Sequence, residues 1–147
     1  MPDTSMIPIE ILLVEDNPGD VRLTREALRE SRMRNNISVA SDGVEAMAFL
    51  HRANPFEKAP RPDLILLDLN LPRKSGRDVL EEIKTDEGLK HIPVVILTTS
   101  QAEQDILASY RLRANAYVTK PVDLEKFLKV VQSIEHFWLE IVKLSRS

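Results

Sequence analysis

The sequence contains no cysteine and no apolar run long enough to span a membrane. The first absence excludes disulfides, thiolate catalysis and thiolate metal sites. The second absence, together with an N-terminus that lacks a basic and apolar signal pattern, predicts a cytoplasmic protein with no membrane segment. Basic residues are not in excess, since the net charge is −3, so the composition gives no reason to expect nucleic-acid binding.

Five short apolar runs alternate with helical patterns along the chain. Their largely apolar character, unbroken over residues 64–67, favours strands buried on both faces of a parallel sheet, and they cover residues 10–14, 37–40, 64–68, 93–97 and 116–118. Helix-start signals stand between the runs, and we expect helices over about 17–34, 42–51, from 75, 100–112 and 123–142. The sequence therefore predicts an α/β fold, doubly wound around a parallel sheet with the flavodoxin-like strand order 2-1-3-4-5.

A single domain accounts for this pattern. Residues 1–8 are polar and contain two prolines, and we expect them to form a loose lead-in to a domain at 9–147. Residues 52–62 contain three prolines and are expected to form a long loop. Because the chain ends after the last predicted helix, we expect no attached output domain, and we expect output through a partner or through self-association.

Reactive polar residues stand where four of the predicted strands end, and they are Glu15 and Asp16, Asp68, Thr98 and Lys120. The topology brings these strand ends to one edge of the sheet. Crowded carboxylates repel one another unless a cation intervenes, and carboxylate ligands in a site open to water favour Mg²⁺. An aspartate beside Mg²⁺ can attack phosphorus. Each residue alone is also consistent with a cap, a strand or a surface position, so the combination carries the prediction.

These residues, in this order and with Pro121 after Lys120, resemble the signature of receiver domains, the CheY-like response regulators of two-component signalling. The resemblance covers about residues 9–142. Segments 61–72, 92–100 and 137–139 are most similar to the small regulators paired with bacterial and cyanobacterial phytochromes. The resemblance implies a receiver fold and a phosphorelay protein whose partner is a sensor histidine kinase, of bacteriophytochrome type. Such a protein is not an enzyme, beyond catalysing its own phosphorylation and dephosphorylation.

The same resemblance implies a role for each residue at the edge of the sheet. Asp68 would accept the phosphoryl group, and Thr98 and Lys120 would sense it. Tyr117 would turn inward as Thr98 moves, which changes the face formed by the fourth helix, the fifth strand and the fifth helix. Mg²⁺ would be bound by Asp16, by Glu15 largely through water, by Asp68, and by the backbone carbonyl of Asn70.

Three other classes of protein compete with this interpretation. A phosphatase or phosphotransferase with an aspartate nucleophile usually carries a second acid two residues after the nucleophile. Here that position is Asn70, which cannot act as a general acid or base. A dinucleotide-binding enzyme is disfavoured because no glycine-rich loop follows the first strand. A non-phosphorylated adaptor would not require the complete set of residues at the edge.

The last predicted helix carries more apolar residues than one face against the sheet requires. Phe137, Trp138 and Ile141 lie in the part that extends beyond the expected core. Aromatic residues at this density more often mark an interface than a folded-back tail. We therefore expect a homodimer on the face of the fourth helix, fifth strand and fifth helix, which also agrees with the dimeric phytochrome-type regulators that the chain resembles.

Overall fold

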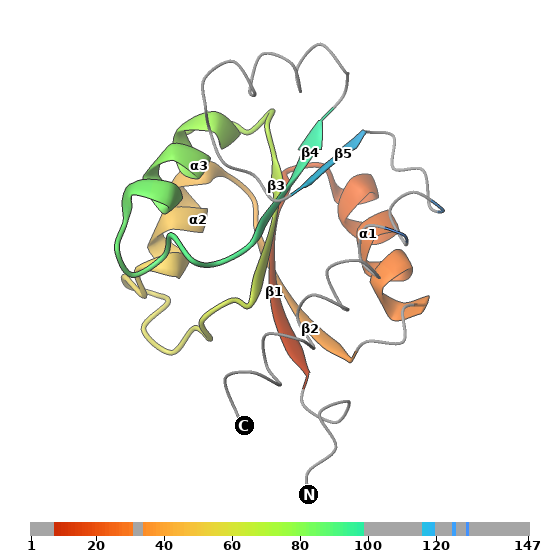
Figure 1. The fold of residues 1–147 in the computed structure, drawn as a ribbon, viewed down its shortest axis with the longest axis horizontal. Helices are drawn as coiled ribbons and strands as arrows, with labels where there is room; N and C mark the ends of the chain where they lie inside the picture. Colours follow the sequence, from red (N-terminus) through yellow and green to blue (C-terminus); the bar gives the residue numbers. More distant parts are fainter. Residues whose placement is uncertain (1–7, 31–33, 99–115, 120–124, 126–128, 130–147) are drawn as a thin grey trace, which may run out of the picture.

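A five-stranded parallel sheet forms the centre of the structure, a computed structural model that describes residues 8–30, 34–98, 116–119, 125 and 129 (Figure 1). The strands are β1 (Ile9–Val14), β2 (Asn35–Ala40), β3 (Leu64–Asp68), β4 (Val94–Thr98) and β5 (Ala116–Thr119). They pair in the order β2-β1-β3-β4-β5, and every pair is parallel. The predicted fold class and strand order are therefore confirmed.

Helices cover both faces of this sheet. The helix α1 (Pro18–Glu30) lies on one face, and α2 (Gly43–Leu50) and α3 (Gly76–Thr85) lie together on the other (Figure 1). Crossovers between parallel strands are right-handed. Because β2 is added on one side of β1 and β3 on the other, the connecting helices lie on opposite faces of the sheet. The helices predicted at 100–112 and 123–142 lie outside the described ranges, except for residues 125 and 129, which are helical.

The core has two halves, one on each face of the sheet, and the strands supply both. Along β3, Ile65 and Leu67 pack with α2 and α3, whereas Leu64 and Leu66 pack with α1. All four side chains are at most 1% exposed. Successive side chains of a strand point to opposite faces, so a strand between two helical layers must be apolar at every position. This requirement explains the unbroken apolar runs in the sequence.

Polar caps begin the helices where the sequence predicts them. The Asp42 carboxylate accepts a hydrogen bond from the Glu45 amide at 2.7 Å, and Ser75 Oγ accepts one from the Asp78 amide at 3.1 Å. The side chain of Asn17 caps α1 in the same way. Each cap satisfies an amide that the helix cannot, and is worth about 1 kcal/mol. All three caps lie in loops that follow the carboxyl ends of strands. They therefore fix the starts of the helices relative to the carboxyl edge of the sheet.

The predicted boundary between the first helix and the second strand is wrong. The helix was expected to run to about Arg34, but Arg34 precedes β2 directly, and β2 begins at Asn35, two residues before the predicted start. The Arg34 carbonyl already accepts a hydrogen bond from Ile9 at 2.8 Å, and the Asn36 side chain donates to Glu10. β2 is an edge strand with one neighbour, so polar residues are tolerated there and no apolar signal marks its start.

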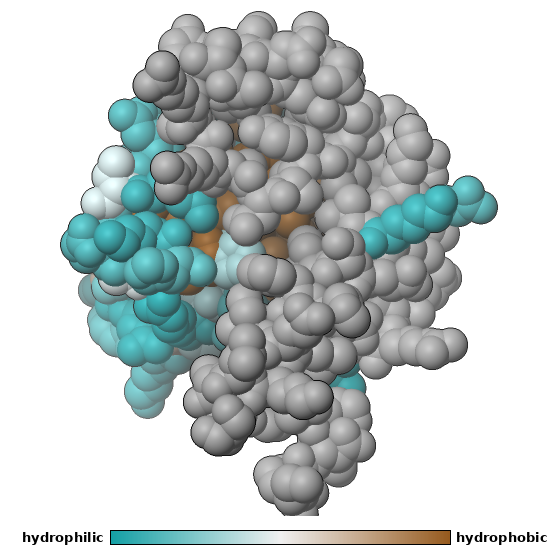
Figure 2. Space-filling view, in the orientation of Figure 1, coloured by the Kyte–Doolittle hydropathy of each residue, from teal (hydrophilic) through white to brown (hydrophobic). Residues whose placement is uncertain are grey.

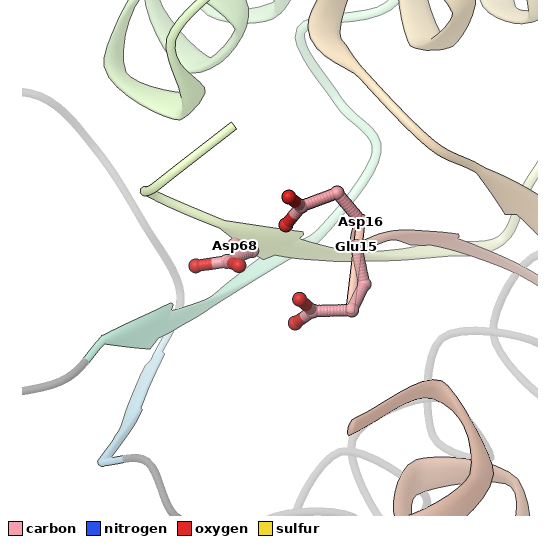
Figure 3. A group of neighbouring side chains, drawn as sticks. All are labelled: Glu15, Asp16 and Asp68. Atoms are coloured by element: carbon pink, nitrogen blue, oxygen red, sulfur yellow. The ribbon is translucent and has the colours of Figure 1, made fainter. Parts of the chain in front are cut away.

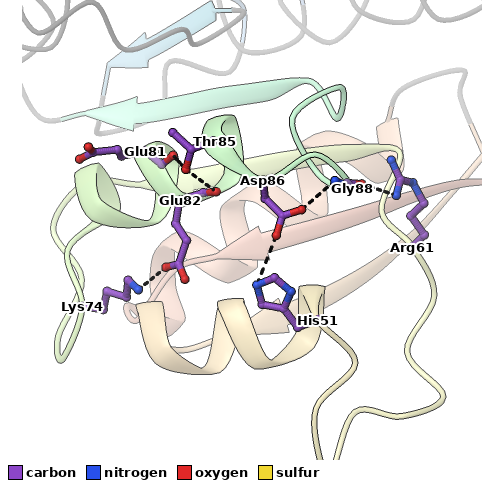
Figure 4. A network of polar contacts seen from close by, with 8 residues as sticks. All are labelled: His51, Arg61, Lys74, Glu81, Glu82, Thr85, Asp86 and Gly88. Atoms are coloured by element: carbon purple, nitrogen blue, oxygen red, sulfur yellow. Dashed lines mark hydrogen bonds and ion pairs between the residues drawn. The ribbon is translucent and has the colours of Figure 1, made fainter.

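The long loop over residues 52–62 is confirmed, and it lies at the amino ends of β3 and β4. Its Phe56 ring packs on Phe49 with centroids 5.6 Å apart. Figure 4 shows Arg61 donating to the Gly88 carbonyl, next to the contact of 3.8 Å between His51 Nε2 and Asp86 Oδ2. These contacts tie the loop to the ends of α2 and α3. They hold it at the end of the sheet opposite to the carboxyl edge.

Hydrophilic side chains cover the outside of α2 and α3, while hydrophobic atoms lie deeper, toward the sheet (Figure 2). Leu23 and Val44 are the large apolar side chains that remain exposed within the described part of the chain. None of the helices described there is long and apolar enough to cross a bilayer.

Candidate functional site

Three carboxylates gather at the carboxyl edge of the sheet. Glu15 and Asp16 directly follow β1, and Asp68 is the last residue of β3. One carboxylate oxygen from each side chain lies within 4.8 Å of the other two. Figure 3 shows the side chains of Glu15 and Asp16 directed toward Asp68. The structure therefore brings together three of the residues that the sequence predicts at this edge.

The register of β1 and β3 explains why these acids meet. Val14 pairs with Leu67, so the next residues of the two strands, Glu15 and Asp68, stand opposite each other. Glu15 continues the alternation of Leu13, and Asp68 that of Leu66, toward the α1 face. A one-residue slip in register would separate the two carboxylates onto opposite faces of the sheet.

Burial and hydrogen bonds hold the acids in place. Glu15 and Asp68 are each 1% exposed, whereas Asp16 is exposed to solvent. The Asn17 amide donates to Glu15 Oε1 at 3.2 Å, and the Asn70 amide donates to Asp68 Oδ1 at 3.1 Å. The Glu15 amide donates to the Ala40 carbonyl at 3.0 Å, which ties this residue to β2. Buried carboxylates need such donors because their desolvation is costly.

The donor set fits a hard divalent cation. Three carboxylate oxygens within 4.8 Å of one another can bind one ion, and Mg²⁺ prefers oxygen ligands. The exposed Asp16 leaves one side of the group open to water, which suits an ion that keeps part of its hydration shell. Asn70 lies two residues after Asp68, in the loop that follows β3, and its backbone carbonyl is the fourth predicted ligand.

The other predicted site residues are placed only by their backbone or not at all. Thr98 ends β4, one residue beyond the partner of Asp68, and it pairs with Thr119 at the end of β5. Tyr117 pairs with Ile96 in the same ladder. The side chains of Thr98 and Tyr117 lie outside what the structure describes, as do Lys120 and the residues predicted at the dimer interface, Phe137, Trp138 and Ile141. Their roles stay predictions.

A close backbone approach shapes the loop that follows Asp68. Gly76 begins α3, and its amide donates to the Leu69 carbonyl at 3.1 Å. A Cβ atom at this position would lie 2.2 Å from the carbonyl oxygen of Asp68 and 2.7 Å from Leu69 Cα. Only glycine fits such an approach without displacing the backbone. The first residue of α3 is therefore packed directly on the acid at the centre of the site.

Comparison with known proteins identifies the class that this fold and site define. The family model for the response regulator receiver domain matches residues 11–132. The chain belongs to this family of signalling proteins. The matched range includes all three acids, Glu15, Asp16 and Asp68.

Individual relatives show which members of this family the chain is similar to. Response regulator Rcp1 of Synechocystis sp. strain PCC 6803 is 53% identical over 144 residues, which is 98% of each chain. A crystal structure of its Mn²⁺-bound form has a TM-score of 0.76 and covers 90% of this chain and 96% of that one. The phosphorylated cyanobacterial phytochrome response regulator RcpA is 51% identical, with a TM-score of 0.77 and coverage of 90% and 95%.

A bacteriophytochrome response regulator, RtBRR, is 41% identical, with a TM-score of 0.80 and coverage of 86% of this chain and 77% of its own. The chain is thus a receiver domain closely related to phytochrome response regulators, and phosphorelay signalling is the function of this class.

Proposed function

We propose that this protein takes a phosphoryl group from a sensor histidine kinase onto Asp68. The observation that carries the proposal is the group of three carboxylates at the carboxyl edge, in a chain that belongs to the receiver family. Asp68 stands at the centre of that edge, on a strand with hydrogen-bonded neighbours on both sides. The relative RcpA is described in its phosphorylated form, which supports the same chemistry here.

The transfer is a substitution at phosphorus. A carboxylate oxygen of Asp68 forms the new O–P bond while the P–N bond to the kinase histidine breaks, and the imidazole leaves with the electron pair. The Asn70 amide donates to Asp68 Oδ1 at 3.1 Å, so it helps to fix the orientation of the attacking carboxylate. Acylphosphate formation from a phosphohistidine or from acetyl phosphate requires only this one bond exchange. Hydrolysis of the acylphosphate by water later restores the carboxylate.

Magnesium is the proposed cofactor. Glu15, Asp16 and Asp68 would hold it together with the carbonyl of Asn70, and the related Rcp1 has been crystallised with Mn²⁺, another divalent cation. When bound, the ion supplies positive charge that offsets the repulsion between the carboxylates and the incoming phosphoryl oxygens. The chain's own contribution is the fixed spacing of these oxygen ligands.

The proposal extends to the signal that follows phosphorylation. Thr98 and Lys120 would bind the phosphoryl oxygens, and Tyr117 would move inward as Thr98 does. The backbone supports this arrangement, because β4 ends beside Asp68 and β5 ends beside Thr98. We further propose a phytochrome-type kinase as the donor, since RcpA and RtBRR, at 51% and 41% identity, are phytochrome response regulators. The expected place of action is the cytoplasm, as a single receiver domain over residues 9–147.

Labelling with acetyl phosphate tests the proposed acceptor. In the presence of Mg²⁺, the wild-type protein should gain one acid-labile phosphoryl group, and Asp68→Asn should gain none. Asp16→Asn keeps the acceptor but should make labelling insensitive to Mg²⁺. Asp78→Asn is the matched control, because Asp78 is an exposed acid in the first turn of α3, close to the site in sequence but outside the group of three. Intact-protein mass spectrometry that finds equal yields in Asp68→Asn and Asp78→Asn would refute the assignment.

A further inference from the structure

The loop between β3 and α3 contains an unusual backbone position at Arg73. Its φ of 67° lies in the left-handed region, which costs an ordinary side chain of order 1 kcal/mol or more. The Arg73 guanidinium donates to Asp42 Oδ2 at 3.3 Å. The Asp42 side chain is only 12% exposed, whereas that of Arg73 is 63% exposed. An interaction across to another loop therefore accompanies the strained residue.

Asp42 is itself firmly held. Its other oxygen, Oδ1, caps α2 by accepting from the Glu45 amide at 2.7 Å. Just before it, the Ala40 carbonyl accepts from the Glu15 amide at 3.0 Å. One carboxylate thus joins the start of α2 to the loop that follows Asp68, two residues after the backbone carbonyl that accepts from Glu15. Its two oxygens do different tasks, because one caps a helix and the other receives Arg73.

A second contact stands beside this ion pair. A Cβ atom at Gly43 would lie 2.2 Å from the Lys74 carbonyl oxygen and 2.7 Å from Lys74 Cβ. The first residue of α2 therefore packs directly on the residue that follows Arg73. Asp42 with Arg73 and Gly43 with Lys74 form two adjacent links between the same pair of loops.

We propose that Asp42 and Arg73 are positioning residues for the metal and acceptor site. Their ion pair holds the β3–α3 loop in the conformation that presents the Asn70 carbonyl and orients Asp68 through the Asn70 amide. The inference deepens the proposed function, on which its Mg²⁺ prediction rests. Neither residue touches the reacting atoms. They act through the loop, whose left-handed turn at Arg73 would otherwise relax and carry Asn70 away from Asp16 and Glu15.

The sharpest variant is Asp42→Asn, which separates the two tasks of this side chain. Asparagine caps helices as well as aspartate does, so α2 keeps its start. The amide lacks the charge that attracts Arg73, so the ion pair is lost. We expect the dissociation constant for Mg²⁺, measured by isothermal titration calorimetry, to rise about three- to fivefold, as suits a partly exposed ion pair.

Variants of Arg73 give an independent reading, because this side chain is mostly exposed and its removal does not disturb the core. Arg73→Gln should weaken Mg²⁺ binding as Asp42→Asn does, and Arg73→Lys, which keeps the charge, should restore most of the affinity. Glu87→Gln is the control. It also removes one negative charge from an ion pair, with Lys90 at 2.8 Å, but at the opposite end of the sheet. Equal Mg²⁺ affinity in Asp42→Asn, Arg73→Gln and Glu87→Gln would overturn the proposal.

Amide hydrogen exchange separates a failure of this inference from a failure of the proposed function. The amides of Asn70, Lys74 and Gly76 are hydrogen-bonded within the loop, and without any metal they should exchange several times faster in Asp42→Asn than in Glu87→Gln. If the wild-type protein bound no Mg²⁺, the proposed function would be wrong. The exchange measurement needs no metal, so it would still test the role of Asp42. Unchanged exchange of the three amides would show that the ion pair does not position the loop.

Discussion

Replacing Gly76 by alanine tests how tightly α3 is packed on Asp68. The added Cβ would lie 2.2 Å from the Asp68 carbonyl oxygen and 2.7 Å from Leu69 Cα, and both atoms belong to the backbone. A backbone neighbour cannot rotate away as a side chain can, so either α3 or the end of β3 must shift. Overpacking of this kind costs about 1–3 kcal/mol.

The higher helix propensity of alanine opposes this steric cost, so the sign of the change in the free energy of unfolding shows which effect is larger. Gly76 lies in a helix and has no positive φ, so alanine suits its conformation and gains up to about 1 kcal/mol in helix propensity. We expect the steric cost to prevail, with a net loss of about 2 kcal/mol in the free energy of unfolding. For a chain of this size that loss lowers Tm by about 4–8 °C.

Urea denaturation followed by circular dichroism measures this free energy, with Gly19→Ala as the control. Gly19 also lies in the first turn of a helix, α1, but a Cβ there meets only the Asn17 side-chain oxygen, at 3.1 Å. That variant should be neutral or slightly stabilising. If Gly76→Ala proved as stable as Gly19→Ala, the close approach to Asp68 would have no energetic meaning and the reasoning would be refuted.

Two further predictions concern pH and assembly. Burial lowers the pKa of Lys84 below its ordinary 10.5, so the unfolded chain binds more protons and stability should rise with pH below that value. Lys84→Met should flatten this rise in alkaline denaturation curves, and an unchanged slope would contradict it. Truncation after Ser133, or Phe137→Ala with Trp138→Ala, should convert the expected dimer to monomer in sedimentation velocity. A full-length monomer at tens of micromolar, with and without phosphorylation, would exclude the dimer.

The fold could be predicted well from the sequence because the sheet is buried on both faces. That burial requires apolar runs such as residues 64–67, and each run ends where polar residues begin, which also marks the carboxyl edge. The starts of α2 and α3 could be predicted because Asp42 and Ser75 cap them through local hydrogen bonds. The apolar runs therefore predict the strands, and the local capping residues predict the starts of the helices.

The links between loops could not be predicted, because they join residues far apart in the sequence. The sequence around Asp42 predicts a helix start, but nothing there indicates that its second carboxylate oxygen meets Arg73, 31 positions later. The left-handed conformation of Arg73 was equally hidden, since glycine is the usual residue there. Asparagine at the start of β2 gave no strand signal, because an edge strand needs less apolar character.

The position of Asp68 on β3 has a mechanical consequence. β3 is bonded to β1 on one side and β4 on the other, and each of its five residues is buried. A segment in the middle of a parallel sheet opens only when much of the domain unfolds, so it is among the stiffest parts of the molecule. A phosphoryl group on Asp68, as proposed, would therefore add charge to a rigid strand. We expect the resulting displacement in the loops around β3 rather than in the strand itself.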